Sequence, residues 1–270
     1  MTQHPKPAVP TQSPQRASVL KVFITGASSG IGYALAEHYA KLGAIIGIVA
    51  RRKDLLRSLA DKLGEDCVIY PVDVRDAVAM DQAAQDFMQR FGVPDIVIGN
   101  AGVSRGTLTE YKEDINAFKM VMEINVLGLL HTFQPFIQPM QQQAHGQLVG
   151  IASVAGIRGL PGAGAYSASK AAAINYLESL RVEMSKSGIS VTTIVPGYIR
   201  TPMTDVNTYK MPFLMEVNVA ADKFAKAIAA KRRVVIIPWQ MGVIARLMHI
   251  LPAAWWDWLA KDAPHKSRSE

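Results

Sequence analysis

The sequence predicts an α/β fold in which short apolar strands alternate with helices in a single domain. An apolar run at residues 19–25 leads through a glycine-rich turn into a helical pattern, and apolar runs followed by helical stretches recur further along the chain. The chain has 270 residues, of which 49% are hydrophobic. That composition is ample for one large packed core, so we expect one domain instead of two small ones.

The first predicted strand, residues 19–25, is followed by TGASSGIG at 25–32 and by the helical pattern YALAEHYAKLG. Glycine in such a turn lets the backbone approach a pyrophosphate, whose charge is stabilised at the helix N-terminus. Glycine-rich turns alone are common, but a strand before it and a helix after it favour dinucleotide binding over a plain tight turn. The residues assigned to this part of the cofactor site are Gly26, Ser28, Ser29, Gly30, Ile31 and Gly32.

The second predicted strand, 44–50, is followed by Arg51, Arg52 and Lys53. Folds that prefer NAD place a carboxylate near this point to hold the ribose 2′-hydroxyl, and no acid stands between Ile45 and Lys53. Arg51 in particular could pair with a 2′-phosphate, so the sequence predicts NADP(H), preferred over NAD(H). We place Arg51 and Arg52 in the cofactor site. The alternative is that Arg52 and Lys53 only begin a solvated helix.

The next two predicted strands, 67–71 and 94–98, also end in cofactor-site residues. Asp73 precedes the amphipathic stretch 77–91, where it could accept from an adenine amino group, cap the helix, or do both. The small residues of GNAG, 99–102, leave room for a flat ring or a ribose. The assigned residues are Asp73, Val74, Asn100, Ala101 and Gly102.

Asn125 lies in an otherwise apolar helical region, predicted over residues 114–136. An amide there is costly unless it is hydrogen-bonded. Asn125 is therefore either a bonded structural amide or part of a water-linked proton path.

The segment AYSASK, 165–170, carries the chemistry. Tyr166 and Lys170 are four residues apart, so on a helix they project from one face. A nearby ammonium is expected to lower the tyrosine pKa toward the operating pH, as a proton donor to an alkoxide requires. Ser153, in LVGIASVAG, can donate a second hydrogen bond to the same oxygen.

The predicted strand 190–195 runs into PGYIRTPM at 196–203, where proline and glycine turn the chain across the strand ends. Residues 204–215 are too irregular for a helix, and we interpret them as a lid over the substrate, with ordinary core as the alternative. The cofactor-site residues assigned here are Pro196, Gly197, Ile199 and Thr201.

These motifs resemble the short-chain dehydrogenase/reductase (SDR) family in its single-domain branch, over roughly residues 19–237. The resemblance rests on TGASSGIG, Asp73–Val74, NAG at 100–102, Asn125, Ser153, YSASK and PGYIRTP. It implies a Rossmann-type doubly wound parallel sheet of about seven strands, with helices on both faces and the cofactor at the strands' C-terminal ends. Gly99 departs from the family pattern, which usually has asparagine there, and Ala152 stands where a second serine is frequent.

The resemblance also implies roles for individual residues. Tyr166 is the proton donor or acceptor, Lys170 lowers its pKa and holds the nicotinamide ribose, and Ser153 orients the carbonyl. Asn125 anchors a water leading to solvent. Thr201 would reach the nicotinamide amide, and Asn100 and Gly102 the adenosine ribose side. The expected reaction is reduction of a ketone or aldehyde by NADPH, or the reverse oxidation of a secondary alcohol, with no metal.

The two ends of the chain supply its formal charge of +7, because residues 22–230 balance. A basic face for nucleic acid is therefore not expected. Residues 1–18 lack an apolar run and are interpreted as a disordered leader, and 19–238 as the catalytic domain. One cysteine excludes an intrachain disulfide and fits a cytoplasmic location.

Residues 239–270 are predicted to be an apolar, Trp-rich helical extension packed on the same domain. Only 13 residues separate Pro238 from Pro252, which is too short to span a bilayer. Packing on the body or on a second subunit, lining a pocket for a hydrophobic or lipid-like substrate, and peripheral contact with a membrane surface all remain open. A homodimer or homotetramer is expected.

Two other classes of function fit parts of the sequence. A non-catalytic NADP(H)-sensing regulatory protein would keep the glycine turn but has no need for Ser153, Tyr166 and Lys170 together. A membrane-associated interaction protein would use the C-terminal helix. The residues do not decide the physiological direction of the reaction, since the same groups serve both.

Overall fold

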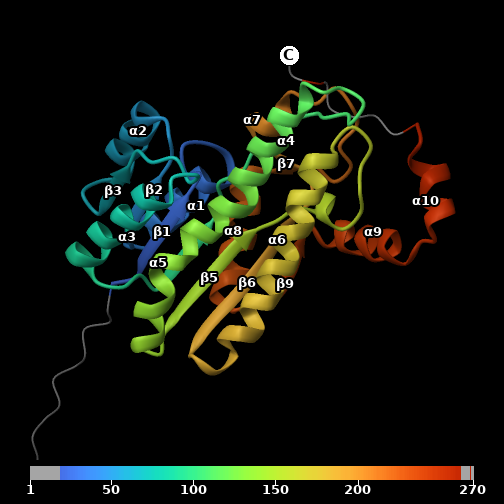
Figure 1. The fold of residues 1–270 in the computed structure, drawn as a ribbon. Helices are drawn as coiled ribbons and strands as arrows, with labels where there is room; N and C mark the ends of the chain where they lie inside the picture. Colours follow the sequence, from blue (N-terminus) through green and yellow to red (C-terminus); the bar gives the residue numbers. More distant parts are fainter. Residues whose placement is uncertain (1–18, 263–267, 269–270) are drawn as a thin grey trace, which may run out of the picture.

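The computed structural model describes residues 19–262 and residue 268. Its centre is a seven-stranded sheet with the order β3-β2-β1-β4-β5-β6-β9, and every neighbouring pair is parallel (Figure 1). The strands are β1 (Lys21–Thr25), β2 (Ile45–Val49), β3 (Cys67–Tyr70), β4 (Ile96–Gly99), β5 (Gly146–Ile151), β6 (Ile189–Pro196) and β9 (Val234–Ile237). The order reverses between β1 and β4, so the carboxyl ends of these strands flank a crevice suited to a ligand.

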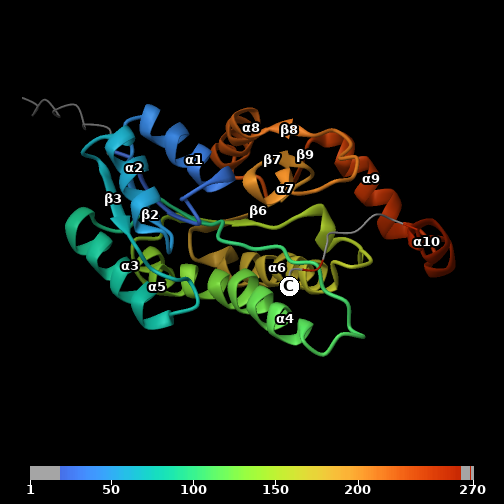
Figure 2. The same ribbon diagram turned by 90° about the horizontal axis from the view of Figure 1, so that it is seen from above.

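Helices cover both faces of the sheet, as Figure 2 shows. The helices are α1 (Gly30–Lys41), α2 (Lys53–Leu63), α3 (Ala77–Phe91), α4 (Asp114–Met122), α5 (Gly128–Gln142), α6 (Gly164–Glu183), α7 (Pro202–Asp205), α8 (Val217–Ala229), α9 (Trp239–Ile250) and α10 (Ala253–Ala260). Buried side chains of α1, α2 and α8 form one core, and those of α3, α5 and α6 form another on the opposite face. The predicted doubly wound α/β fold is confirmed.

Two predicted helices are interrupted. The region expected as one helix over 114–136 is α4, a π-helical turn (Glu123–Leu127) and α5. The C-terminal extension consists of two helices, α9 and α10, with Pro252 between them, because proline disfavours helical backbone in the residue before it. The leader predicted at 1–18 lies outside the described residues.

Among the described residues, Asp114–Gln142 is the one helical stretch whose length and composition would allow it to cross a bilayer. Its residues pack against α3 and α6, and Phe133 and Phe136 belong to the core below the sheet. A helix of the protein core meets the same criteria, and its packing explains its apolar character.

Two short strands frame the segment that we interpreted as a lid. β7 (Ile199–Arg200) pairs with β8 (Met215–Glu216), and Arg200 and Glu216 form an ion pair of 2.7 Å. α7 occupies 202–205, so the first residues of the predicted irregular segment are helical after all. Thr204 stabilises this turn by donating from its hydroxyl to the Ile199 carbonyl at 2.7 Å.

Candidate active site

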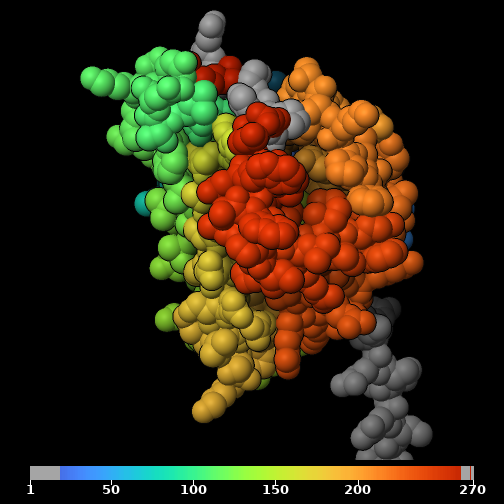
Figure 3. Space-filling model, turned by 90° about the vertical axis from the view of Figure 1, so that its right-hand side faces the viewer, coloured from blue at the N-terminus to red at the C-terminus, as the bar shows by residue number. Residues whose placement is uncertain are grey.

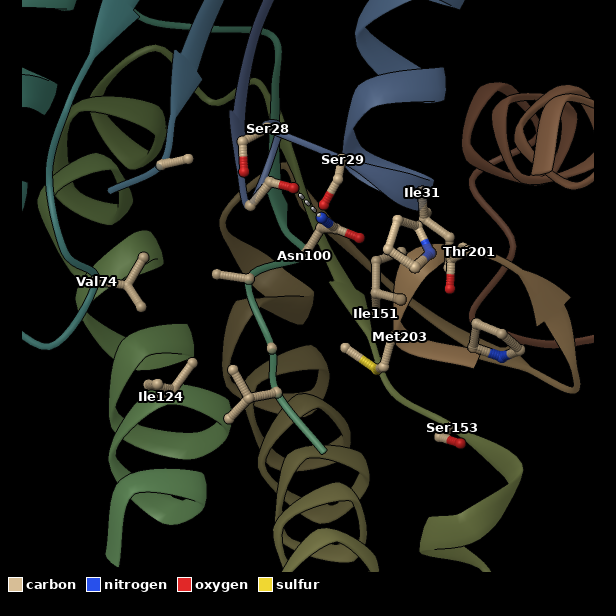
Figure 4. Close-up of a pocket in the computed structure, with 18 of the residues that line it drawn as sticks. Ser28, Ser29, Ile31, Val74, Asn100, Ile124, Ile151, Ser153, Thr201 and Met203 are labelled. Atoms are coloured by element: carbon tan, nitrogen blue, oxygen red, sulfur yellow. Dashed lines mark hydrogen bonds between the residues drawn. The ribbon is translucent and has the colours of Figure 1, made fainter. Parts of the chain in front are cut away.

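A cavity of about 380 Å³ lies at the carboxyl ends of the parallel strands. Figure 4 shows Ser28 and Ser29 at one end of it and Ser153 at the other, with Val74 and Ile124 along one side. All the predicted cofactor residues line it except Gly32, which lies behind the turn, and so do Ser153, Tyr166 and Lys170. Asn125 is not in the lining. The residues that sequence reasoning missed are Ala50, Val72, Val103, Ile124, Ile151, Ala152, Pro202, Met203 and Thr204.

The glycine turn is shaped so that backbone, not side chain, faces the cavity. Gly26 has φ +70°, and a Cβ there would lie 2.7 Å from the Cα of Ala101. A Cβ on Gly32 would lie 2.5 Å from both the Gly26 carbonyl oxygen and the Asn100 Nδ2. Ser29 precedes the first turn of α1, and its side chain does not cap it. The helix N-terminus is therefore open toward the cavity, which fits the pyrophosphate of a dinucleotide.

Two arginines follow β2 at the rim of the cavity. Arg52 donates from Nη2 to the hydroxyls of Ser28 at 2.9 Å and Ser29 at 3.2 Å. This contact with the glycine turn favours a place for Arg52 in the cofactor site. Lys53 is the first residue of α2 and is exposed, as the alternative interpretation expects. Arg51 is 56% exposed at its side chain and lies 3.9 Å from Asp73.

Asp73 carries a negative charge that the surrounding arginines compensate. Arg75 donates to both carboxylate oxygens, at 2.7 Å to Oδ2 from Nη2, and these bonds hold the pKa of Asp73 below its usual range. The cap of α3 is Asp76, which accepts from the Ala79 N–H at 3.0 Å. The helix-capping alternative for Asp73 is therefore wrong.

Asn100 ties together the ends of β1 and β4. Its Nδ2 donates to the carbonyls of Thr25 at 2.9 Å and Gly26 at 3.1 Å, and its backbone N–H donates to the Thr25 hydroxyl at 3.2 Å. The amide nitrogen thus fixes the glycine turn, so Asn100 supports the shape of the cavity as well as lining it.

Asn125 sits in the π-helical turn and is 2% exposed. Its Oδ1 accepts from the Val103 N–H at 2.8 Å, and its Nδ2 donates to the Val103 carbonyl and to the Ser169 hydroxyl, both at 2.9 Å. Both amide protons are satisfied by the protein, as the structural interpretation requires. One acceptor position on Oδ1 stays available for a water, so the proton-path role of Asn125 stays a prediction.

Ser153, Tyr166 and Lys170 come together from two neighbouring elements. Ser153 follows β5, and Tyr166 and Lys170 lie one turn apart on α6. The Ser153 hydroxyl lies near enough to the Tyr166 phenol to favour its ionised form, and it also accepts from the Ala155 N–H at 3.2 Å. Lys170 Nζ donates to the Ile151 carbonyl at 2.9 Å and lies 5.9 Å from the centre of the Tyr166 ring. This is the grouping that the sequence predicted.

The pKa of Tyr166 differs from the expectation. Burial raises it above its ordinary value, and the nearby Ser153 hydroxyl only partly offsets this effect. Lys170 is not among the groups that shift the pKa of Tyr166, and burial lowers the pKa of Lys170 itself from 10.5 to about 8. At neutral pH Tyr166 is consequently protonated, which is the form that can donate a proton.

The lowered pKa of Lys170 makes the stability of the nucleotide-free protein depend on pH. Between pH 8 and 10.5 the unfolded chain binds more protons than the folded chain, so the free energy of unfolding rises with pH. Above about pH 9 the raised pKa of Cys67, about 12, opposes this trend. We expect the wild type to gain about 1 kcal/mol between pH 7.5 and 9 relative to Lys170→Met, measured by urea unfolding. If the free energies of unfolding of wild type and Lys170→Met changed with pH in the same way, the lowered pKa of Lys170 would be contradicted.

Two tyrosines pack against each other near the predicted lid: Tyr198 directly precedes β7, and Tyr209 lies between α7 and β8. Tyr198 and Tyr209 form an edge-to-face ring pair with centres 6.5 Å apart. Burial raises the pKa of Tyr209, and the nearby Tyr198 and Tyr166 add to this effect. Tyr209 does not line the cavity, so the lid role of residues 204–215 stays a prediction. Among the described residues no group of three His, Cys, Asp or Glu side chains could hold a metal ion.

Comparison with known proteins gives a family-level match. The model of the family described as "short chain dehydrogenase" matches residues 20–211. An uncharacterized oxidoreductase of Myxococcus xanthus (strain DK1622) is 36% identical over 241 residues, covering 88% of this chain and 95% of the relative.

Solved structures share the fold. A short chain dehydrogenase/reductase from Burkholderia phymatum in complex with NAD superposes with a TM-score of 0.79 at 24% identity, covering 94% of this chain and 99% of the other. The closed form of a serine dehydrogenase in complex with NADP⁺ superposes with a TM-score of 0.75 at 22% identity, covering 81% and 94%. Both nucleotides thus occur among proteins of this architecture.

Proposed function

The chain belongs to the short chain dehydrogenase family of NAD(P)-dependent oxidoreductases, and from that premise we propose an NADPH-dependent reductase of a ketone or aldehyde, working reversibly on a secondary alcohol. The observation that carries the proposal is that Ser153, Tyr166 and Lys170 line the same cavity as the glycine turn. A non-catalytic nucleotide sensor would need the turn but not this grouping, so the enzyme is favoured.

The bound nicotinamide cofactor would supply the hydride. Tyr166, protonated at neutral pH, would donate its proton to the carbonyl oxygen as negative charge grows there. The Ser153 hydroxyl would donate a second hydrogen bond to the same oxygen. Lys170 is held by the Ile151 carbonyl on the cavity wall, where its ammonium would hold the nicotinamide ribose and favour the tyrosinate left after proton transfer.

We also propose that the chain prefers NADPH to NADH. Support comes from the basic rim, where Arg51 is exposed, and from the absence of a carboxylate in the 50–53 segment that follows β2. Arg51 could reach a 2′-phosphate, while Arg52 already lies against Ser28 and Ser29 at the turn.

Replacing Arg51 with alanine tests the preference. We expect Arg51→Ala to raise the Kd for NADPH about tenfold, because a charge-assisted hydrogen bond to the phosphate is lost, and to leave the Kd for NADH unchanged. Titration of nucleotide fluorescence gives both constants. Lys53→Ala, which removes a neighbouring exposed charge from α2, is the matched control. An equal loss for both nucleotides would show that Arg51 does not read the phosphate.

A hydrophobic or lipid-like substrate is the proposed substrate class. A second cavity of about 600 Å³, lined mostly by apolar side chains, lies between Ile157, Ile236 and helix α9. Ile157 is four residues beyond Ser153, so this cavity adjoins the loop that follows the proposed catalytic serine. Long-chain ketones should lose more activity than short-chain ketones when residues 239–270 are deleted.

The experiment that tests the proposed function is NADPH oxidation, with NADH as control, across ketones and aldehydes graded by chain length and bulk. Absence of turnover with measurable NADPH binding would favour the sensor.

A cytoplasmic location and a homodimer or homotetramer are also proposed. Apolar side chains left exposed on α4 and α6, such as Phe118 and Val182, would suit a subunit interface. Peripheral contact with a membrane is proposed as well, and the exposed Trp255 and Trp258 on α10 support it. Light scattering would test the oligomeric state, and sedimentation with liposomes would test the membrane contact.

A further inference from the structure

Arg268, close to the C-terminus, makes a concentrated set of contacts with the segment that leads into α4. Its Nε donates to Asp114 Oδ2 and its Nη2 to Asp114 Oδ1, both at 3.0 Å, so the pair is bidentate. Nη2 also donates to Glu113 Oε1 at 3.2 Å, and the guanidinium lies 3.4 Å from the centre of the Tyr111 ring. Planar stacking combined with a two-pronged carboxylate contact is specific to arginine, and lysine cannot reproduce it.

The carboxylate that Arg268 holds also organises the loop in front of it. Asp114 is 8% exposed, and its Oδ2 accepts from the Leu108 N–H at 2.8 Å in addition to Arg268. Gly106 and Arg268 form a parallel strand-like bridge. Arg268 therefore contacts the loop from both ends, through Gly106 and through Asp114. Without the arginine, Asp114 would keep a mostly buried charge with fewer partners.

From this loop the contacts continue to the proposed proton donor. The Thr107 N–H donates to the Gly162 carbonyl at 3.0 Å, and the Thr107 hydroxyl accepts from the Ala165 N–H at 3.4 Å. Ala165 immediately precedes Tyr166 in the first turn of α6. The loop ahead of α4 is thus fastened to the start of the helix that carries Tyr166.

A second arginine contacts the two C-terminal helices from the loop that follows Ser153. Arg158, in the loop after Ser153, donates to the Leu251 carbonyl at 3.0 Å and lies 5.4 Å from the Trp256 ring. Figure 3 shows α9 and α10 (red) across the centre of this face, between the green and yellow segments on one side and the orange segments on the other.

We propose that Arg268 is a positioning residue for the substrate half of the active site, because it holds the loop ahead of α4 that is bonded to the first turn of α6. The inference rests on the proposed reductase function. Arg268 acts through Asp114 and Thr107 on the loop beside Tyr166, and none of its contacts reaches the glycine turn or Arg51. Its loss should therefore weaken substrate binding and spare the nucleotide.

Four full-length variants test this: Arg268→Gln, Arg268→Lys, Asp114→Asn and the double variant Arg268→Gln/Asp114→Asn. For Arg268→Gln we expect KM for the best carbonyl substrate to rise about fivefold, with kcat and the Kd for NADPH within about twofold of wild type. The KM of Arg268→Lys should fall between those of wild type and Arg268→Gln, because lysine keeps the charge but cannot make the bidentate contact with the carboxylate. In the Asp114→Asn background the arginine replacement should add less than about twofold, because the partners act as one unit. Lys261→Gln, which removes an exposed charge from the same segment, is the control.

Hydrogen exchange provides a readout that needs no substrate. In Arg268→Gln the amide of Leu108 should exchange faster, while amides of β1 should not change. Equal effects on substrate and NADPH, additive effects in the double variant, or unchanged exchange at Leu108 would each overturn the inference. If no carbonyl is turned over, the proposed function fails, and the exchange experiment still decides whether Arg268 holds the loop.

Discussion

Tyr166→Phe is expected to lower kcat for carbonyl reduction at least about 100-fold, because removing the hydroxyl removes the proton donor. The aromatic ring stays, so the packing of α6 and the contact with Lys170 are kept. The Kd for NADPH should consequently stay within about twofold of wild type. Single-turnover NADPH oxidation with the best substrate of the panel, together with nucleotide titration, measures both quantities.

Tyr176→Phe is the matched control for this variant. Tyr176 lies on the same helix, and burial raises its pKa to about 12, but it does not line the cavity. It should retain full activity. Retention of more than about a tenth of wild-type kcat by Tyr166→Phe would exclude the phenol as the essential acid.

Much of the site could be predicted because its residues stand at the ends of strands that the sequence marks clearly. Apolar runs predicted β1, β2, β3, β4 and β6 to within two residues. Parallel strands bring their carboxyl ends to one edge, so residues distant in the chain gather there without further information. Tyr166 and Lys170, by contrast, were predicted from their spacing of four residues on a helix.

What could not be predicted depends on partners far away in the chain. Asn125 bonds to Val103 and Ser169, and these contacts accompany a π-helical turn that periodicity does not signal. The predicted lowering of the Tyr166 pKa is not seen, because burial, which spacing does not reveal, raises it. Gly99 is explained only by packing, since a Cβ there would run into the Leu129 side chain of α5.

Gly32→Ala is expected to impair nucleotide binding and stability together. A methyl group at this position would lie 2.5 Å from the Gly26 carbonyl oxygen and from the Asn100 Nδ2. Neither is the far end of a flexible chain: one is backbone, and the other is fixed by bonds to Thr25 and Gly26. The glycine turn must therefore move. Overpacking of this kind costs about 1–3 kcal/mol, shared between unfolding and the distorted binding surface.

Comparing the loss of stability with the loss of nucleotide affinity shows whether the glycine turn binds the cofactor or only stabilises the fold. If the turn binds the pyrophosphate, Gly32→Ala should raise the Kd for NADPH and the Kd for NADH by the same factor, about tenfold or more, because both nucleotides share that group. Gly159→Ala, where a Cβ meets nothing within 4 Å, should change neither the Kd nor the melting temperature. A Gly32→Ala protein that melts several degrees lower yet binds both nucleotides as tightly as wild type would show that the close packing of α1 against Gly26 stabilises the fold alone. Since the helix N-terminus faces the cavity and its serine leaves it uncapped, we expect the loss in binding to be the larger of the two effects.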